Sequence, residues 1–300
     1  FDVIIIGGGL SGLTCGISLC SRGLGAAIVS AGQSSLYFNT GSFDLLGWDA
    51  SGAPVTEPLK ALGDVPAYRF LSDAPQLAAR AKKLLEDAGM AVEGSAETNS
   101  YRVTPLGVLR PCWLMLRNVP EAVLPWDKTG PGLYLQQALV RRFRSLGGLL
   151  LNGDEACGGK IENGRVTGVS TEKLGPGAIE AKYYVLASGS FMNRGLAATA
   201  EEVFEPVFGA DVVSGPERTS PDVFDRQPYM GFGVAFDPSF RVFKTGRRPS
   251  GNSDGSAVGN LFACGQILSG NDPVRFGNAE GVQMLSALQV ADNIIEEISL

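Results

Sequence analysis

The chain has 300 residues, of which 44% are hydrophobic, and its 25 basic and 31 acidic residues give a net charge of −6. This length and apolar content allow one large or two modest domains with a hydrophobic core. The acidic balance without any basic block argues against nucleic acid as a partner, and no apolar run reaches the length of about 18 residues that typifies a membrane-spanning helix.

The first predicted elements form a βαβ unit. Val3–Ile6 is apolar on both faces, which is typical of a strand in a buried parallel sheet. A helix is predicted over Leu10–Ser21 and a second strand over Ala26–Ser30. Strand, glycine turn, helix and strand within about thirty residues indicate a βαβ unit.

Gly7, Gly9 and Gly12 match the G-x-G-x-x-G fingerprint of dinucleotide-binding proteins. Gly7 permits the tight turn, Gly9 lets the backbone approach a pyrophosphate, and Gly12 lets the helix pack close to the sheet. The phosphates would lie at the helix N-terminus, where free N–H groups and the helix dipole favour anions. The pattern therefore predicts a nucleotide site that includes Leu10 and Ser11.

The acidic residue that usually binds the ribose about twenty positions after the glycines is missing. The second strand ends at Ser30 and is followed by Gly32 and Gln33. We expect Ser30 and Gln33 to replace the carboxylate with neutral contacts. Such contacts would bind the adenosine half less tightly, so a ligand shorter than a dinucleotide stays possible.

The middle of the chain mixes helices with irregular segments. Residues 31–47 are expected to form an ordered loop, and helices are predicted over Ala74–Ala88 and Tyr134–Leu146. Residues 101–115 are typical of a strand and turn. Residues 117–135 combine Pro and Gly without periodicity, so we expect a junction with a missing segment near 126–135.

The last third returns to the strand pattern. Asn163-Gly164 between alternating segments predicts a hairpin, and residues 178–190 predict a strand that ends in a glycine turn at Ser188–Ser190. The late return to a strand and glycine turn resembles the two-dinucleotide-binding-domain flavoproteins, and residues 260–270 resemble the element in which a strand ends beside the flavin. This resemblance implies that a helix from Ala279 has its N-terminus near the flavin pyrimidine, where the dipole stabilises a reduced, anionic flavin.

Histidine is absent, which excludes Ser-His-Asp and Cys-His catalysis and histidine metal ligands. The cysteines show no C-x-x-C spacing, so we predict no metal site and a reduced, cytoplasmic compartment. We expect no disulfide between Cys15 and Cys20, and a buried Cys264. No secretory signal is visible at the start of the chain. The chain also begins without methionine, from which we expect a trimmed sequence.

Taken together, these elements predict an α/β, Rossmann-like flavoprotein fold with a parallel sheet, a β-meander and a truncated or missing cap. The flavin-nucleotide domain would comprise residues 1–50 and 132–300. Residues 51–131 would form a partial cap or substrate region.

Several segments, in this order, resemble the B subunit of anaerobic glycerol-3-phosphate dehydrogenases. The blocks that contain Gln33–Leu46 and Arg102–Arg110 are the most diagnostic, because generic flavoproteins lack them. The resemblance is carried by FDVIIIGGGLSGLTCGISL, VSAGQSSLYFNTGSFDLL, RVTPLGVLRPCWL, YVLASGSF and NLFACGQILSGNDP.

The resemblance implies a flavin subunit of a three-part, membrane-associated enzyme that passes electrons from glycerol 3-phosphate through an iron–sulfur subunit towards quinone. It also implies two partners, a catalytic flavoprotein subunit and an iron–sulfur membrane-anchor subunit, through which the chain would associate peripherally with the membrane. The family is described with FMN. The dinucleotide fingerprint instead predicts FAD, because it provides for a pyrophosphate, and FMN stays as the alternative.

Two other functions compete with this hypothesis. One is a stand-alone FAD-dependent oxidoreductase of the fumarate-reductase-like group with another substrate. The other is a structural subunit that binds no flavin. Within the family hypothesis, the flavin would either oxidise the substrate or only relay its electrons, and the lack of a histidine base favours relay.

No catalytic residue is assigned from the sequence. Arg275 is predicted to bind the substrate phosphate, because it lies in the expected flavin loop. The predicted cofactor-binding residues are Gly7, Gly9, Leu10, Ser11, Gly12, Ser30, Gln33, Ser34, Gly41, Ser42, Ala187, Ser188, Gly189, Gly265, Gln266, Asp272 and Gly277.

Overall fold

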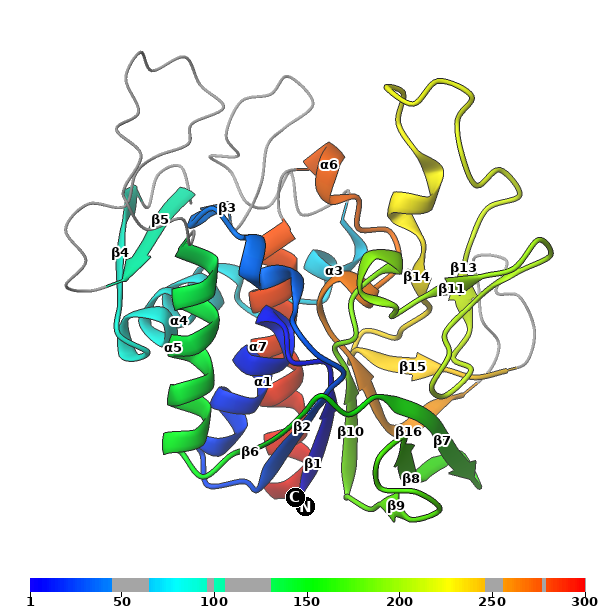
Figure 1. The fold of residues 1–300 in the computed structure, drawn as a ribbon, viewed down its shortest axis with the longest axis horizontal. Helices are drawn as coiled ribbons and strands as arrows, with labels where there is room; N and C mark the ends of the chain where they lie inside the picture. The colour runs from blue at the N-terminus through cyan, green and yellow to red at the C-terminus, as the bar shows by residue number, and fades with distance from the viewer. Residues whose placement is uncertain (45–64, 96–99, 106–130, 246–255, 277–278, 300) are drawn as a thin grey trace.

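A six-stranded sheet forms the centre of the computed structural model, which describes residues 1–44, 65–95, 100–105, 131–245, 256–276 and 279–299 (Figure 1). The strand order is β15-β16-β10-β1-β2-β6, and all neighbours are parallel except β15, which is antiparallel to β16. The strands are β1 (Val3–Ile6), β2 (Ala26–Ser30), β6 (Leu149–Asn152), β10 (Tyr183–Leu186), β15 (Arg241–Phe243) and β16 (Ala257–Ala263).

Strand β1 lies in the middle of this sheet because it is apolar on both faces. All four of its residues are buried, and Ile5 pairs with Ile28 of β2 on one side and Val185 of β10 on the other. The predicted bounds of β1 and β2 are confirmed.

Helices cover one side of the sheet (Figure 1). Helix α1 packs against α5 and α7, and α4 packs against α7. Every residue of α1 is buried, including the small polar residues Ser11, Thr14 and Ser18, so the helix lies inside the protein along its whole length. The helices are α1 (Leu10–Cys20), α3 (Pro66–Arg69), α4 (Ala74–Asp87), α5 (Pro131–Ser145), α6 (Pro273–Phe276) and α7 (Ala279–Ser299).

The predicted helices agree with this arrangement to within a few residues. Helix α5 begins at Pro131, three residues before the predicted start, because proline fits the first turn of a helix. Helix α4 is capped by Asp73, whose carboxylate accepts a hydrogen bond of 2.9 Å from Gln76 N.

A three-stranded meander of β7 (Ala156–Glu162), β8 (Arg165–Thr171) and β9 (Ala178–Ile179) packs against β16. Its first turn is the predicted Asn163-Gly164 hairpin. Both residues have positive φ angles, 51° and 73°, which a two-residue type I′ turn requires. The hairpin prediction is confirmed.

A second small sheet includes part of residues 31–47, for which the sequence predicts an ordered loop without regular elements. This segment contains a 3₁₀ helix, Ser35–Phe38, and strand β3 (Ser42–Asp44). Strand β3 pairs with β5 (Ser100–Pro105), which in turn pairs with β4 (Met90–Ser95). A strand of three residues has too short a pattern to be recognised when its partner lies more than fifty residues away.

The remaining elements are short. Strand β11 (Ala197–Ala198) pairs with β12 (Val203–Phe204), and β13 (Val212–Val213) pairs with β14 (Gly233–Val234). The other 3₁₀ helices are Phe191–Asn193, Pro228–Gly231 and Gly265–Ile267.

The cysteines behave as predicted where the structure describes them. Cys15, Cys20 and Cys264 are buried and unbridged, and burial raises the pKa of each thiol. Cys112 lies outside the described residues. Among the helices that the structure describes, none is long and apolar enough to cross a membrane.

Candidate functional site

A cleft of about 580 Å³ lies at the carboxyl ends of β1, β2 and β10. Strand β1 is the point from which the chain order of the sheet runs in opposite directions, to β2 and β6 on one side and to β10 and β16 on the other. Parallel α/β sheets bind ligands at such a switch point, outside the carboxyl ends of the strands. The volume is also in the usual range for a small-molecule site.

Gly7 and Gly12 are required by the turn that forms the floor of this cleft. Gly7 has a φ of +119°, and a Cβ atom there would lie 2.2 Å from the carbonyl oxygen of Ala187. A Cβ atom at Gly12 would lie 1.9 Å from the carbonyl oxygen of Gly7. The absence of a side chain at Gly12 therefore lets α1 pack directly on the turn, as the fingerprint predicts.

Gly9 has a different role, since packing within the described chain does not require it. Its backbone is extended, with φ −84° and ψ −167°, and a Cβ atom would meet only Ser34 Cβ at 3.7 Å among the described atoms. Gly9 precedes α1, whose N-terminus has neither a capping side chain nor an acidic residue in its first turn. The backbone N–H groups of this turn are therefore free to bind an anion.

Two hydroxyl groups of the cleft lack hydrogen-bond partners. The Oγ atoms of Ser34 and Ser188 are buried and have no partner among the described residues, although both residues line the cleft. A buried hydroxyl without a partner is costly. A polar ligand with phosphate and hydroxyl groups would satisfy both serines, so the lining fits a nucleotide.

Gln266 connects the cleft to the start of α7. Its Nε2 donates to the carbonyl oxygen of Ala279 at 3.2 Å, and its Oε1 accepts from Asn271 Nδ2 at 2.9 Å. Asn271 is only 2% exposed. Packing and hydrogen bonds thus fix the orientation of the Gln266 amide at this end of the cleft.

The structure brings most of the predicted residues to the cleft. The predicted residues that line it are Gly7, Gly9, Leu10, Ser11, Ser30, Gln33, Ser34, Ala187, Ser188, Gly189 and Gln266. Ser30 Oγ donates to the carbonyl oxygen of Gly32 at 3.0 Å, so this hydroxyl already has one acceptor in the loop after β2.

Other predicted residues serve the fold around the cleft and are not among the described residues that line it. Gly12 is one of these residues, as described above. Gly265 is another: it packs on Ser11, and a Cβ atom added at Gly265 would lie 2.0 Å from Ser11 Oγ. Gly41 forms a left-handed turn, with φ +80°, and Ser42 pairs with β5.

Asp272 has a structural role at α6. Its carboxylate accepts hydrogen bonds from Val274 N and Arg275 N, and it forms an ion pair of 3.2 Å with Arg226. Arg275 is exposed, with its guanidinium 4.8 Å from the ring centre of Phe276. Gly277 lies outside the described residues.

One wall of the cleft was not predicted from the sequence. It consists of residues of β7, residues that follow β6, β8, β10 and β12, and one residue of α7. Several of these residues follow strands that lie beside β2 or β1, namely β6 and β10. The strand order must be known before this position can be used to predict them. The missed residues are Glu155, Ala156, Cys157, Glu172, Met192, Asn193, Arg194, Pro206, Val207 and Gln283.

Glu205 supports this wall from beneath. Its carboxyl group is 1% exposed and accepts backbone hydrogen bonds from Val207, Phe208 and Ala210. Burial raises the pKa of this carboxyl group, against the opposing effect of the N–H donors. Glu205 therefore fixes the loop that carries Pro206 and Val207 into the cleft.

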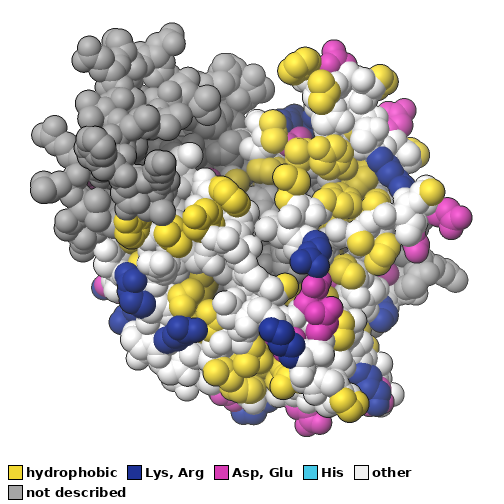
Figure 2. All heavy atoms as spheres, in the orientation of Figure 1, with side chains coloured by type: hydrophobic (Ala, Val, Ile, Leu, Met, Phe, Trp, Pro, Cys, Tyr) yellow, Lys and Arg dark blue, Asp and Glu magenta, His cyan; other side chains and the backbone are white. Residues whose placement is uncertain are grey.

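A smaller hollow of about 400 Å³ lies near α6. Figure 2 shows apolar side chains gathered over the segment between β13 and β14, beside α6. The hollow is lined by Val213, Ser214, Gly215, Arg226, Pro228, Gly231, Phe232 and Gly270. Its position beside the loop over residues 265–272 places it next to the flavin end expected from the sequence.

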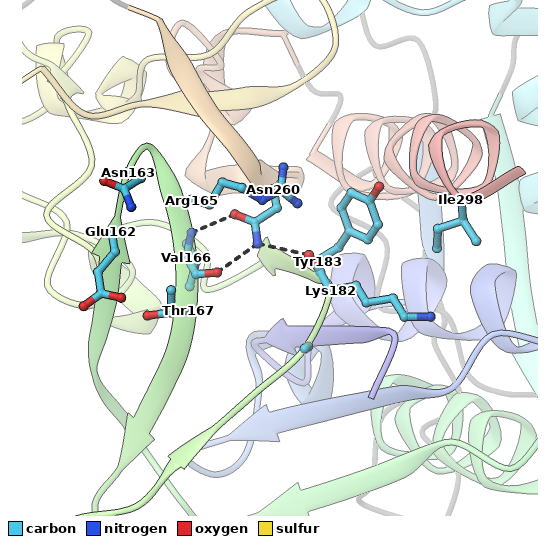
Figure 3. A pocket seen from close by; sticks show the side chains of 10 residues that line it. Glu162, Asn163, Arg165, Val166, Thr167, Lys182, Tyr183, Asn260 and Ile298 are labelled. Carbon is cyan, nitrogen blue, oxygen red and sulfur yellow. Dashed lines mark hydrogen bonds between the residues drawn. The ribbon is translucent and has the colours of Figure 1, made fainter. Parts of the chain in front are cut away.

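A third hollow of about 610 Å³ lies at the opposite end of the parallel strands, beside the start of β10 (Figure 3). Its floor is Asn260, which accepts a hydrogen bond from Val166 N at 2.7 Å and donates to the carbonyl oxygens of Val166 and Lys182 at 2.9 and 3.0 Å. The amide is thus satisfied within the protein. This hollow is slightly larger than the cleft. It lies at the amino ends of the parallel strands, however, whereas ligands of such sheets bind outside the carboxyl ends, so the cleft is the better candidate for the ligand site.

Comparison with known proteins supports the flavoprotein interpretation. The family model for a FAD binding domain matches residues 2–134 and 119–282. The expectation of FAD as the cofactor is therefore confirmed.

The chain is similar along its whole length to curated bacterial proteins. It is 30% identical over 429 aligned positions to the B subunit of the anaerobic glycerol-3-phosphate dehydrogenase of Yersinia pseudotuberculosis, with 100% of this chain and 99% of that protein covered. The B subunit of the same enzyme from Pectobacterium carotovorum is 30% identical over 428 positions, with both chains covered completely.

Solved structures resemble the fold. A flavocytochrome c3 fumarate reductase in its open conformation aligns with a TM-score of 0.60 and 12% identity, covering 98% of this chain and 78% of that one. Mycobacterium smegmatis Sdh1 in complex with UQ1 aligns with a TM-score of 0.55 and 13% identity, covering 99% and 69%. These neighbours confirm the predicted α/β, Rossmann-like fold.

Proposed function

Because the chain belongs to the family of the anaerobic glycerol-3-phosphate dehydrogenase B subunits, we propose that it is the FAD-bearing subunit of an enzyme that oxidises glycerol 3-phosphate to dihydroxyacetone phosphate. The coarser conclusion, a FAD-dependent oxidoreductase, follows from the family model and the relatives. The single observation that carries the finer proposal is the full-length similarity to proteins of that name, joined to a cleft built for a dinucleotide.

The residues of the cleft suit an extended FAD molecule. The N-terminus of α1 and the turn at Gly9 would hold the pyrophosphate, and Ser34 and Ser188 would satisfy their free hydroxyls on its polar groups. The adenosine would extend past the end of β2, and the flavin would extend towards Gln266. When bound, the flavin ring supplies the chemistry of accepting two electrons as a hydride and passing them on.

Arg275 is proposed as the contact for the substrate phosphate. It lies on α6 beside the loop at the flavin end, and among the described residues no carboxylate forms an ion pair with its guanidinium. Its donors are thus available for a charge-assisted hydrogen bond.

The partners of the chain are proposed from the same similarity. A protein named as a B subunit implies other subunits, and we propose that these are a catalytic flavoprotein subunit and an iron–sulfur subunit that anchors the enzyme to the membrane and carries electrons towards quinone. Such partners would place this chain at the cytoplasmic face of a membrane.

A shortened cap is the proposed difference from the relatives. The alignment with the Yersinia protein has 429 positions, whereas this chain has 300 residues, so at least 129 positions have no counterpart here. The two parts of the family match overlap at residues 119–134, near the junction predicted at 126–135. We therefore propose residues 1–50 and 132–300 as the flavin domain and 51–131 as the remainder of a cap.

The test of the function is anaerobic reduction of the flavin in the enzyme assembled with its partner subunits. We expect glycerol 3-phosphate to bleach the visible flavin absorbance, and glycerol or glycerol 2-phosphate to leave it unchanged. Bleaching in the chain alone would assign substrate oxidation to this subunit. If the chain alone is not bleached but the absorbance lost in the assembly corresponds to both its flavin and that of the partner flavoprotein, this subunit relays electrons. A flavin that stays oxidised in the assembly would contradict the proposal, and a chain that cannot be loaded with any flavin would be a structural subunit.

The position of the cofactor can be tested separately through Cys157, which is exposed and lines the cleft. Bound FAD should slow alkylation of Cys157 by a maleimide by about tenfold or more, because the nucleotide would cover the thiol. Peptide mass spectrometry separates Cys157 from Cys112, and Cys157→Ser identifies the labelled peptide. Equal labelling rates with and without saturating FAD would place the cofactor elsewhere.

A further inference from the structure

The adenosine end of the cleft lacks the carboxylate that dinucleotide-binding folds usually provide at the end of the second strand. Strand β2 ends at Ser30, and the next acidic residue along the chain is Asp44. The chain nevertheless binds FAD, so its ribose hydroxyls need another acceptor. The structure brings one to this place from a distant part of the sequence.

That acceptor is Glu155, which follows strand β6. Strand β6 lies beside β2, with Asn152 paired to Ser30. Beyond the strands, the carbonyl oxygen of Ser30 accepts hydrogen bonds from Gly153 N at 2.7 Å and Asp154 N at 3.1 Å. These bonds attach the segment after β6 to the end of β2, so Glu155 lines the cleft where the missing acidic residue would have been.

An arginine from the same wall, Arg194, forms an ion pair with the Glu155 carboxylate. Arg194, which follows the 3₁₀ helix after β10, donates from Nη1 to both carboxylate oxygens of Glu155, at 2.9 and 3.2 Å. A carboxylate has about four acceptor positions, so hydrogen-bonding capacity remains for a diol. The arginine also offsets the repulsion between this carboxylate and a nearby pyrophosphate.

The other acidic residues at this end of the cleft are less suited. Asp154 is buried and uses its carboxylate for Thr171 Oγ1 at 2.7 Å and Lys173 N at 2.9 Å. Glu172 lines the cleft, but its carboxylate has no hydrogen bond to any described residue that would hold it in place. Only Glu155, of these three, combines a position at the end of β2 with a fixed, partly free carboxylate.

We infer that Glu155, oriented by Arg194, binds the ribose hydroxyls of the adenosine half of FAD. The inference rests on the FAD orientation of the proposed function, with adenosine at the end of β2. Arg194 acts as a positioning residue. The carboxylate that binds the ribose would thus come from the segment after β6, and not from the end of β2 as dinucleotide-binding folds usually have it.

Affinity measurements on the purified chain test this inference without reference to activity. We expect Glu155→Gln to weaken FAD binding by about tenfold or more, because a charged acceptor is replaced by an amide. Glu180→Gln, a matched control at an exposed glutamate that is not among the described residues lining the cleft, should change it less than twofold. Fluorescence titration of FAD gives the dissociation constants, and thermal melting confirms that both variants fold.

Competition of FAD with ADP and with its dideoxy analogue identifies the ribose as the group that is bound. In the wild type, ADP should compete with FAD more strongly than 2′,3′-dideoxy-ADP, which lacks the ribose hydroxyls. In Glu155→Gln, the ratio of the two inhibition constants should fall to about one. As a single substitution, Arg194→Gln should weaken FAD binding. In the double variant with Glu155→Gln, it should weaken binding little further, because the two residues act as one unit.

The inference is wrong if Glu155→Gln binds FAD as the wild type does, or if it still distinguishes ADP from the dideoxy analogue. A wild-type chain that binds neither FAD nor ADP would instead contradict the proposed function.

Discussion

Replacing Gly9 with alanine should weaken FAD binding strongly in a chain that still folds. The extended backbone of Gly9 accepts a side chain without strain, and the added Cβ atom would make an ordinary contact of 3.7 Å with Ser34 Cβ. The free energy of unfolding should stay within about 1 kcal/mol of the wild type. The methyl group would, however, occupy the space through which the pyrophosphate approaches the backbone, at a cost of about 1 to 3 kcal/mol, or about ten- to hundredfold in affinity.

Fluorescence titration with FAD and urea unfolding of the apoprotein measure the two quantities on the same sample. Gly158→Ala is a suitable control, because a Cβ atom there meets no described atom within 4 Å and Gly158 is not among the described residues that line the cleft. If Gly9→Ala bound FAD with wild-type affinity, the pyrophosphate would not lie against this turn.

The nucleotide-binding unit could be predicted from sequence because its determinants are local. A run of four apolar residues, three glycines at fixed spacing and a short second strand lie within the first 30 residues, and β1, α1 and β2 follow them closely. The Asn163-Gly164 hairpin is equally local, since a two-residue turn with positive φ angles determines it.

Features that depend on distant strands could not be predicted in the same way. The wall that contains Glu155 and Arg194 exists because β6 and β10 flank the β1–β2 pair, and no local pattern shows that order. Strand β3 was missed for the same reason.

Polar loop residues have roles that their local sequence does not distinguish. Asp272 is predicted to bind the cofactor, and in the structure its carboxylate also caps α6 and pairs with Arg226. From sequence alone, an aspartate that caps a helix and one that binds a ribityl hydroxyl have the same appearance, because both lie in short polar loops after a strand.

Replacing Gly12 with alanine should, in contrast to the Gly9 substitution, strongly destabilise the fold itself. A Cβ atom at Gly12 would lie 1.9 Å from the Gly7 carbonyl oxygen, which is backbone and cannot rotate away as a side chain would. The higher helix propensity of alanine is worth only about 1 kcal/mol, whereas moving α1 off the turn would disturb a helix that is buried along its whole length. We expect a loss of about 3 kcal/mol or more in the free energy of unfolding.

Urea unfolding of the apoprotein measures this loss, with Gly16→Ala as the comparison on the same helix. At Gly16 the nearest atom, at 2.8 Å, belongs to the ring of Phe143, a side chain that can shift, so the destabilisation should be clearly smaller. Saturating FAD should stabilise Gly12→Ala less than it stabilises the wild type, because moving α1 off the turn would also displace the backbone groups proposed to bind the pyrophosphate. A Gly12→Ala chain as stable as the wild type would show that α1 can move away from the turn, and the separation between Gly9, which serves the ligand, and Gly12, which serves the fold, would then be wrong.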